Sequence, residues 1–134
     1  MFDAASFLKV VAFALVYAGI EYRYVNRYER DYTKSAEGFV EKPVFSVFTP
    51  YHVYLLLPLF AIVAFTEQFT AWIGNGLVLA VLEDIAYFAW RGRWVTKGEW
   101  TTTLIGSISL GRVEIPAWWP IDIAAAFALF LLPV

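Results

Sequence analysis

The chain has 134 residues, of which 60% are apolar and 16% charged, and its formal net charge is −2. A soluble domain of this size could not bury so much apolar surface in one core, so we expect a single integral membrane domain over residues 1–134. The near balance of charge argues against a nucleic-acid partner. The absence of cysteine excludes disulfides, thiolate metal sites and cysteine nucleophiles.

Four apolar runs follow one another along the chain, and we expect each to be a membrane-spanning helix. A helix needs about 20 mainly apolar residues to cross a hydrocarbon core of about 30 Å. A signal peptide is a poor interpretation of the first run, because Asp3 and Lys9 lie near its start and no small-residue cleavage site follows it. The expected fold is an all-α membrane protein, a four-transmembrane-helix bundle, with spans near residues 3–22, 50–70, 73–91 and 118–134.

Local signals predict where these helices continue, bend and turn. Aromatic and acidic residues recur at helical spacing from Tyr17 to Tyr32, so the first helix is expected to continue beyond the membrane as an amphipathic extension. Pro58 removes the hydrogen bond to the carbonyl of Tyr54, which predicts a bend. The turn between the second and third spans is expected at residues 74–76 or just before them.

The six tryptophans lie at or near the ends of the apolar runs, where indole rings anchor helices at the membrane interface. The segment 91–117 between the third and fourth spans is neither long nor apolar enough to cross the bilayer. Its residues 101–115 alternate weakly, contain two glycines and are rich in β-branched side chains. This pattern predicts a small irregular loop or a β-hairpin.

Basic residues are concentrated in the segments 22–49 and 91–117, whereas the turn between the second and third spans has none. The positive-inside rule therefore places both segments in the cytoplasm and both termini outside. The expected location is the cell (plasma) membrane, crossed several times.

With this topology, every predicted helix carries an ionisable side chain in the cytoplasmic half of the membrane. Small residues share helical faces with three of the carboxylates, and such faces allow helices to approach closely, so these carboxylates are expected to point into the bundle. We expect Glu83 to lie within reach of His52 and of another carboxylate. Ionisable side chains inside a bilayer are costly and indicate a functional site by default. The cluster comprises Glu21, His52, Glu83, Asp84 and Asp122.

Three interpretations of this cluster remain open. It could be a structural polar network, in which Asp84 pairs with Arg91 and Glu83 bonds to Tyr87 or His52. It could be a catalytic site, with Glu83, Asp84 and His52 as acid and base, or a divalent-metal site. It could also be a pathway in which Glu83 carries a proton or ion. The candidate metal ligands are Glu21, His52, Glu83 and Asp122.

Each interpretation implies a class of function. The first is a structural or accessory membrane subunit within a larger complex or a homo-oligomer, because four thin helices bury little. The alternative is a membrane-embedded enzyme acting on a lipid or prenyl substrate, whose headgroup Arg23, Arg91 and Arg93 would hold. The second alternative is a small ion or proton-coupled channel or transporter. The lipid bilayer is the one partner that the composition indicates, and the sequence has no haem, nucleotide or iron–sulfur motif.

Overall fold

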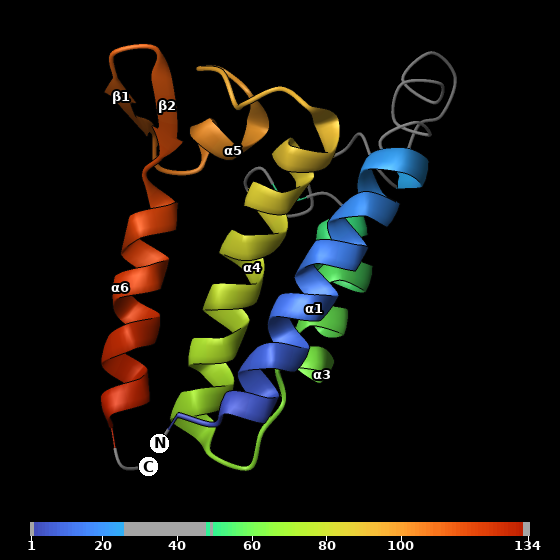
Figure 1. The fold of residues 1–134 in the computed structure, drawn as a ribbon, viewed down its shortest axis with the longest axis vertical. Coiled ribbons are helices and arrows are strands. Elements are labelled where there is room, and N and C mark those ends of the chain that lie inside the picture. Colours follow the sequence, from blue (N-terminus) through green and yellow to red (C-terminus); the bar gives the residue numbers. More distant parts are fainter. Residues whose placement is uncertain (1, 26–47, 49, 133–134) are drawn as a thin grey trace.

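Four helical segments that alternate in direction form the body of the protein, and a small hairpin lies at one end (Figure 1). The structure is a computed structural model that describes residues 2–25, 48 and 50–132. The first segment is α1 (Ala4–Ile20), which continues as the π-helical turn η1 (Glu21–Val25). The second consists of the π-helical η2 (Tyr51–Leu56) and α3 (Leu57–Ala64). The remaining elements are α4 (Phe69–Arg91), α5 (Trp100–Thr103), β1 (Ser107–Leu110), β2 (Val113–Pro116) and α6 (Trp118–Leu131).

Two of the four segments are long and apolar enough to cross a membrane. Ala4–Tyr24 has 21 residues with a mean hydropathy of 1.6, and Phe69–Arg91 has 23 residues with a mean hydropathy of 1.3. The apolar helices Tyr51–Ala64 and Trp118–Leu131 are shorter. The latter has 14 residues, and at about 1.5 Å per residue it is about 21 Å long, less than the roughly 30 Å of a hydrocarbon core. The first and third helices thus have the length and composition of membrane spans, whereas the four-span bundle stays a prediction.

The second helical segment ends at Ala64, whereas the sequence analysis extended it to residue 70. Its last carbonyl groups lack partners within the helix, and side chains from α1 and α4 bind them instead. The donor–acceptor pairs are Lys9 Nζ to Phe65 O (3.1 Å), Trp72 Nε1 to Ala61 O (2.8 Å) and Asn75 Nδ2 to Ala64 O (3.3 Å). These tertiary contacts stabilise the end of the helix at Ala64. They join different helices, so no local sequence pattern predicts them.

The turn between α3 and α4 lies at residues 65–68, so the prediction that placed it at or just before residues 74–76 is wrong, and these residues belong to α4. A side chain at Gly74 would come within 2.7 Å of the Phe130 ring, so this glycine allows α6 to pack closely. Asn75 is buried and donates a 2.8 Å hydrogen bond to Ser6 Oγ of α1. Gly74 and Asn75 therefore serve helix packing rather than a chain reversal.

Pro58 lies in the first turn of α3, directly after the π-helical η2. The Leu57 N–H donates to His52 O, five residues back, instead of following the α-helical pattern. The predicted bend near Pro58 and the predicted partner for the Tyr54 carbonyl both stay predictions. The expected amphipathic extension beyond Val25 lies outside the described residues.

The hairpin interpretation of residues 101–115 is confirmed, although it starts later than expected. β1 and β2 pair antiparallel, with Leu110 opposite Val113 across a two-residue turn. Gly111 supplies the positive φ of +65° in this turn. The preceding residues form the short helix α5, which the sequence analysis did not anticipate.

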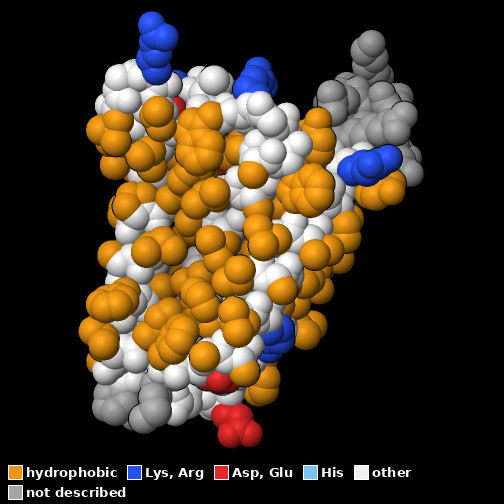
Figure 2. Space-filling view, viewed as in Figure 1, with side chains coloured by type: hydrophobic (Ala, Val, Ile, Leu, Met, Phe, Trp, Pro, Cys, Tyr) orange, Lys and Arg blue, Asp and Glu red, His pale blue; other side chains and the backbone are white. Residues whose placement is uncertain are grey.

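The surface of the helical body is apolar on the side where α1 lies. Hydrophobic side chains cover the middle of this face, and most of its charged side chains gather toward the two ends (Figure 2). Helix α4 contacts α1, α3 and α6 and is therefore the central helix. The side chains of α4 consequently fill the space between the other helices.

Candidate functional site

A cavity of about 830 Å³ runs along one face of α4 and is also lined by residues of α3 and α6. Its α4 residues recur every three or four positions and so share one helical face. Ile73 and Arg91, at the two ends of this face, are 18 residues apart, which corresponds to about 27 Å. Members of this face that line the cavity include Ile73, Gly76, Ala80, Glu83, Tyr87 and Arg91.

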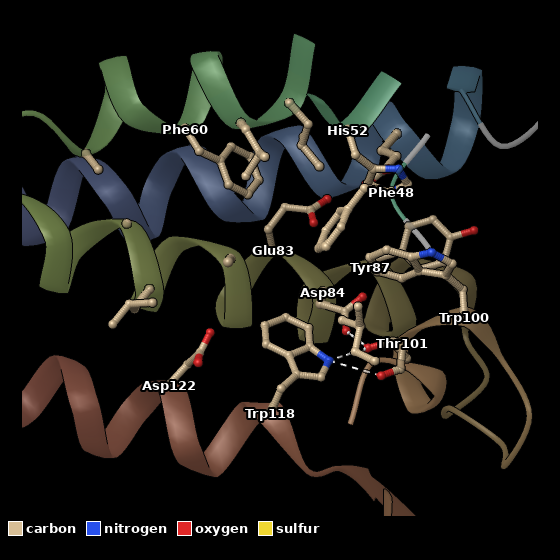
Figure 3. A pocket seen from close by; sticks show the side chains of 18 of the residues that line it. Phe48, His52, Phe60, Glu83, Asp84, Tyr87, Trp100, Thr101, Trp118 and Asp122 are labelled. Carbon is tan, nitrogen blue, oxygen red and sulfur yellow. Dashed lines mark hydrogen bonds between the residues drawn. The ribbon is translucent and has the colours of Figure 1, made fainter. Parts of the chain in front are cut away.

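The two ends of the cavity differ in chemistry. Toward the turn between α3 and α4, the lining is apolar and includes Ala61, Ile73 and Leu77. Toward the hairpin, the lining is polar and aromatic, and the close-up view shows several of these side chains converging from different elements (Figure 3). An elongated cavity with one apolar and one polar end matches the shape and chemistry of an amphiphile.

Glu83 is the most deeply buried acidic residue of the cavity, with a relative exposure of 5%. Its carboxyl group lies within hydrogen-bonding reach of Glu21, the last acidic residue of the first helical segment. Its Oε1 atom has no hydrogen-bond partner among the described residues. A buried polar atom without a partner loses its hydrogen bonds to water and gains none in return. A bound ligand can supply the missing hydrogen bond.

Asp84 lines the same cavity but is held by hydrogen bonds. Its Oδ2 atom accepts from Thr101 Oγ1 at 2.5 Å and from Trp119 Nε1 at 2.9 Å. The Trp118 indole N–H in turn donates to both the carbonyl and the hydroxyl oxygen of Thr101, each at 3.0 Å. Figure 3 shows Asp84 directed toward Trp118 and Thr101, and Glu83 directed toward the side of His52 and Phe60. Adjacent carboxyl groups thus serve different sides of α4.

Arg91 pairs with Glu99 rather than with Asp84, the partner considered in the structural-network interpretation. Its Nη1 and Nη2 atoms bind the two carboxylate oxygens at 2.8 and 3.1 Å. Arg91 also donates to the carbonyl groups of Arg93 and Trp94. The chain reverses after Gly92, whose φ is +70°, and this reversal brings Glu99 back to the end of α4.

The carboxyl group of Glu99 has a pKa below its usual range. Partial burial acts to raise this pKa, but hydrogen bonds from Arg91 and from the Thr96 N–H outweigh the effect of burial. Glu99 therefore stays ionised and keeps the Arg91 guanidinium neutralised. An arginine in this position binds a further anion less readily than a free one.

The other residues that were predicted to form the site differ in their position relative to the cavity. The His52 ring lines it and stacks on Trp100, with centroids 4.6 Å apart and planes 8° from parallel. Asp122 reaches it from α6, is half-buried, and has no hydrogen bond or ion pair with a described residue. Arg23 and Arg93 are exposed and do not line it in the described part of the chain. Of the three arginines expected to hold a headgroup, only Arg91 lines the cavity among the described residues.

The expected metal ligands line one cavity without forming a preformed metal site. Glu21 and Glu83 lie together, while His52 and Asp122 project from other helices. Within residues 2–25, 48 and 50–132, no three histidine or acidic side chains are close enough to hold a metal ion. Divalent-metal binding at these residues therefore stays a prediction that the arrangement does not favour.

The residues that sequence analysis missed are mainly the tryptophans, which it assigned to the membrane interface. Indole hydrogen bonds to other parts of the protein are donated by Trp72, Trp90, Trp94, Trp118 and Trp119, and the last two belong to the network of Asp84. Their position directly before the apolar run of α6 was visible in the sequence. Their acceptor was not, because Trp119 and Asp84 are 35 residues apart.

Comparison with known proteins gives no match for this chain, neither to a family, nor to a characterised protein, nor to a solved structure. The chemistry of the cavity is therefore the basis for assigning a function.

Proposed function

We propose that the protein is an integral membrane protein that binds a lipid-like, single-chain amphiphile in the cavity along α4. The observation that carries this proposal is the buried carboxyl group of Glu83 at the polar end of a largely apolar cavity, whose Oε1 atom has no hydrogen-bond partner in the described structure. A volume of about 830 Å³ falls within the roughly 300–1,000 Å³ typical of small-molecule sites. An apolar chain would occupy the end near Ile73, and a polar head would occupy the end near Glu83.

Membrane insertion is part of the proposal. Two helices are long and apolar enough to cross a bilayer, and apolar side chains cover the middle of the face in Figure 2. We propose that α3 and α6 also lie within the membrane, with the hairpin end in the cytoplasm of the cell. The basic residues of segments 22–49 and 91–117 support this orientation. Lipids could then enter the cavity sideways from the bilayer.

The cavity favours this function over the other two classes considered. In a purely structural subunit, the polar groups between the helices would be expected to satisfy one another. Asp84 is satisfied in this way by Thr101, and Arg91 is satisfied by Glu99. Glu83 does not follow that pattern. A channel would need a polar path from end to end, whereas the half of the cavity near Ile73 and Leu77 is apolar. Chemistry on a bound amphiphile is compatible with the same site, with Glu83 and Glu21 as acid and base.

Photo-crosslinking tests the proposal. The full chain is reconstituted in lipid nanodiscs with a trace of hexadecanol carrying a diazirine in its chain, and labelled residues are mapped by mass spectrometry. Labelling should concentrate on the cavity-lining faces of α3 and α4, near Ala61 and Leu77. Recovery of a chemically altered probe would add an enzymatic role.

Two variants, each replacing an alanine with phenylalanine, provide the test and its control. Ala80→Phe places a ring in the cavity and should reduce labelling of its lining several-fold, whereas Ala124→Phe adds the same ring to an exposed position of α6 outside the lining. Uniform labelling of the outer helix faces, unaffected by Ala80→Phe, would contradict the proposal.

A further inference from the structure

We infer that the polar end of this cavity selects amphiphiles with a cationic amine headgroup and discriminates against phosphate and carboxylate headgroups. This inference rests on the proposed function and specifies the class of ligand. It reverses the expectation that arginines would hold an anionic headgroup. The carboxyl groups at the polar end carry the inference.

The charges that line the cavity are predominantly negative. Among the described lining residues there are five acidic side chains and one arginine. That arginine, Arg91, is neutralised by two short contacts to Glu99 and donates its other hydrogen bonds to backbone carbonyls. Even with one of the five carboxyl groups neutral and Glu99 paired with Arg91, the remaining carboxylates would give this end a net negative charge. Such a field attracts a cation and repels an anion.

Two of the carboxyl groups have acceptor atoms available to a headgroup. Glu83 is 5% exposed and its Oε1 atom has no partner in the described structure. Asp122 reaches the cavity from α6 without a hydrogen bond or ion pair to a described residue. Figure 3 shows Asp122 directed from α6 toward α4 and Glu83 directed from α4 toward the side of α3, and both line the same cavity. An ammonium group carries several N–H donors and suits acceptors that approach from different sides.

Aromatic rings complete the surroundings of the headgroup. Tyr87, Trp100 and Trp118 line the polar end, and Figure 3 shows them around the space beside Asp84. The faces of aromatic rings attract cations, most strongly when the cation is desolvated. Acidic acceptors combined with aromatic faces are the usual surroundings of a bound ammonium group, whereas an anionic headgroup would gain nothing from either.

Competition against the photo-labelling probe tests the inference. Hexadecylamine, hexadecanol and hexadecyl phosphate share one chain and differ only in the headgroup, and each is added to nanodiscs of a neutral lipid at neutral pH. Hexadecylamine should displace the probe roughly tenfold more effectively than hexadecanol, which is the order expected for one partly desolvated charge pair, and hexadecyl phosphate should be the weakest competitor.

Variants locate the source of the preference. Glu83→Gln should reduce the advantage of hexadecylamine over hexadecanol, and Asp122→Asn should do so independently should Glu83→Gln fail to fold. Glu67→Gln changes an exposed acidic residue outside the cavity and should leave the order of competitors unchanged. Equal or stronger competition by hexadecyl phosphate would overturn the inference while leaving the cavity as a lipid site. Absence of specific labelling by the parent probe would instead contradict the proposed function itself.

Discussion

The two sides of α4 present the same kind of residue in opposite situations. On the side of α6 and the hairpin, Asp84 accepts hydrogen bonds from Thr101 and Trp119. On the side of α1 and α3, Glu83 is more deeply buried but keeps an oxygen atom without a partner in the described structure. The two residues are adjacent in the sequence and about 100° apart around the helix, so their surroundings alone make the difference.

This contrast separates polar groups that hold the fold from polar groups that remain available. A buried carboxylate with donors is expected to stabilise the structure, and its removal leaves those donors unsatisfied. A buried carboxylate without donors costs free energy in the empty protein. A ligand that donates a hydrogen bond to such a group would offset this cost. The two sides of α4 should therefore respond differently to mutation.

The largest effect is expected at the end of α4, where Arg91→Ala removes a bidentate ion pair and the hydrogen bonds to two carbonyl groups. Side-chain exposures of 16% for Arg91 and 24% for Glu99 show that the pair is largely shielded from solvent. We expect the free energy of unfolding to fall by about 3 kcal/mol, because Glu99 is left without its main partner. Denaturation in mixed detergent micelles measures the change.

Arg93→Ala is the control for this variant. Arg93 lies 3.5 Å from the same carboxylate, but its side chain is 69% exposed. Exposed pairs contribute little, so the loss should be below about 0.5 kcal/mol. Similar losses for the two arginines would show that the Arg91 pair does not have the structural role assigned to it.

A smaller effect is expected from Asp84→Ala, which removes the acceptor for the Thr101 hydroxyl and the Trp119 indole N–H. Each orphaned donor carries a desolvation penalty, and a total loss of about 2 kcal/mol is expected. Thr101→Val removes the hydroxyl from the other end of the same hydrogen bond. Because the two changes break one interaction, the double variant should lose less than the sum of the single losses. Additive losses would argue that Asp84 and Thr101 act separately.

The sequence predicts the parts of this arrangement that depend on local periodicity. Helical spacing placed small residues on the same face as Glu83, and the small residues Gly76 and Ala80 of this face line the cavity with it. The alternation and glycines of residues 101–115 indicated the hairpin. In both cases the signal lies within a single element, where spacing determines which side chains share a face.

The partners of the polar groups could not be predicted in the same way. Helical spacing suggested that Arg91 would pair with Asp84, seven residues earlier, but the reversal after Gly92 brings a better-placed acceptor in Glu99. The early end of α3 depends on donors such as Lys9, which is 56 residues distant from the carbonyl group of Phe65. Contacts of this kind follow from how the helices pack, and single-sequence patterns carry little information about them.

The smallest change in stability is expected where the burial is deepest. Glu83→Gln keeps the shape of the side chain and removes a carboxyl group from the neighbourhood of Glu21. Because Glu83 Oε1 accepts no hydrogen bond from a described residue, no donor is orphaned there, and relief of the contact between two acidic groups acts in favour of the variant. The free energy of unfolding should therefore change by less than about 1 kcal/mol, and in the direction of greater stability. The same micelle titration measures it, with Asp84→Asn as the equivalent change one residue further along α4. A loss of about 2 kcal/mol or more for Glu83→Gln would mean that this carboxyl group holds the helices together, and the distinction between the two sides of α4 would then disappear.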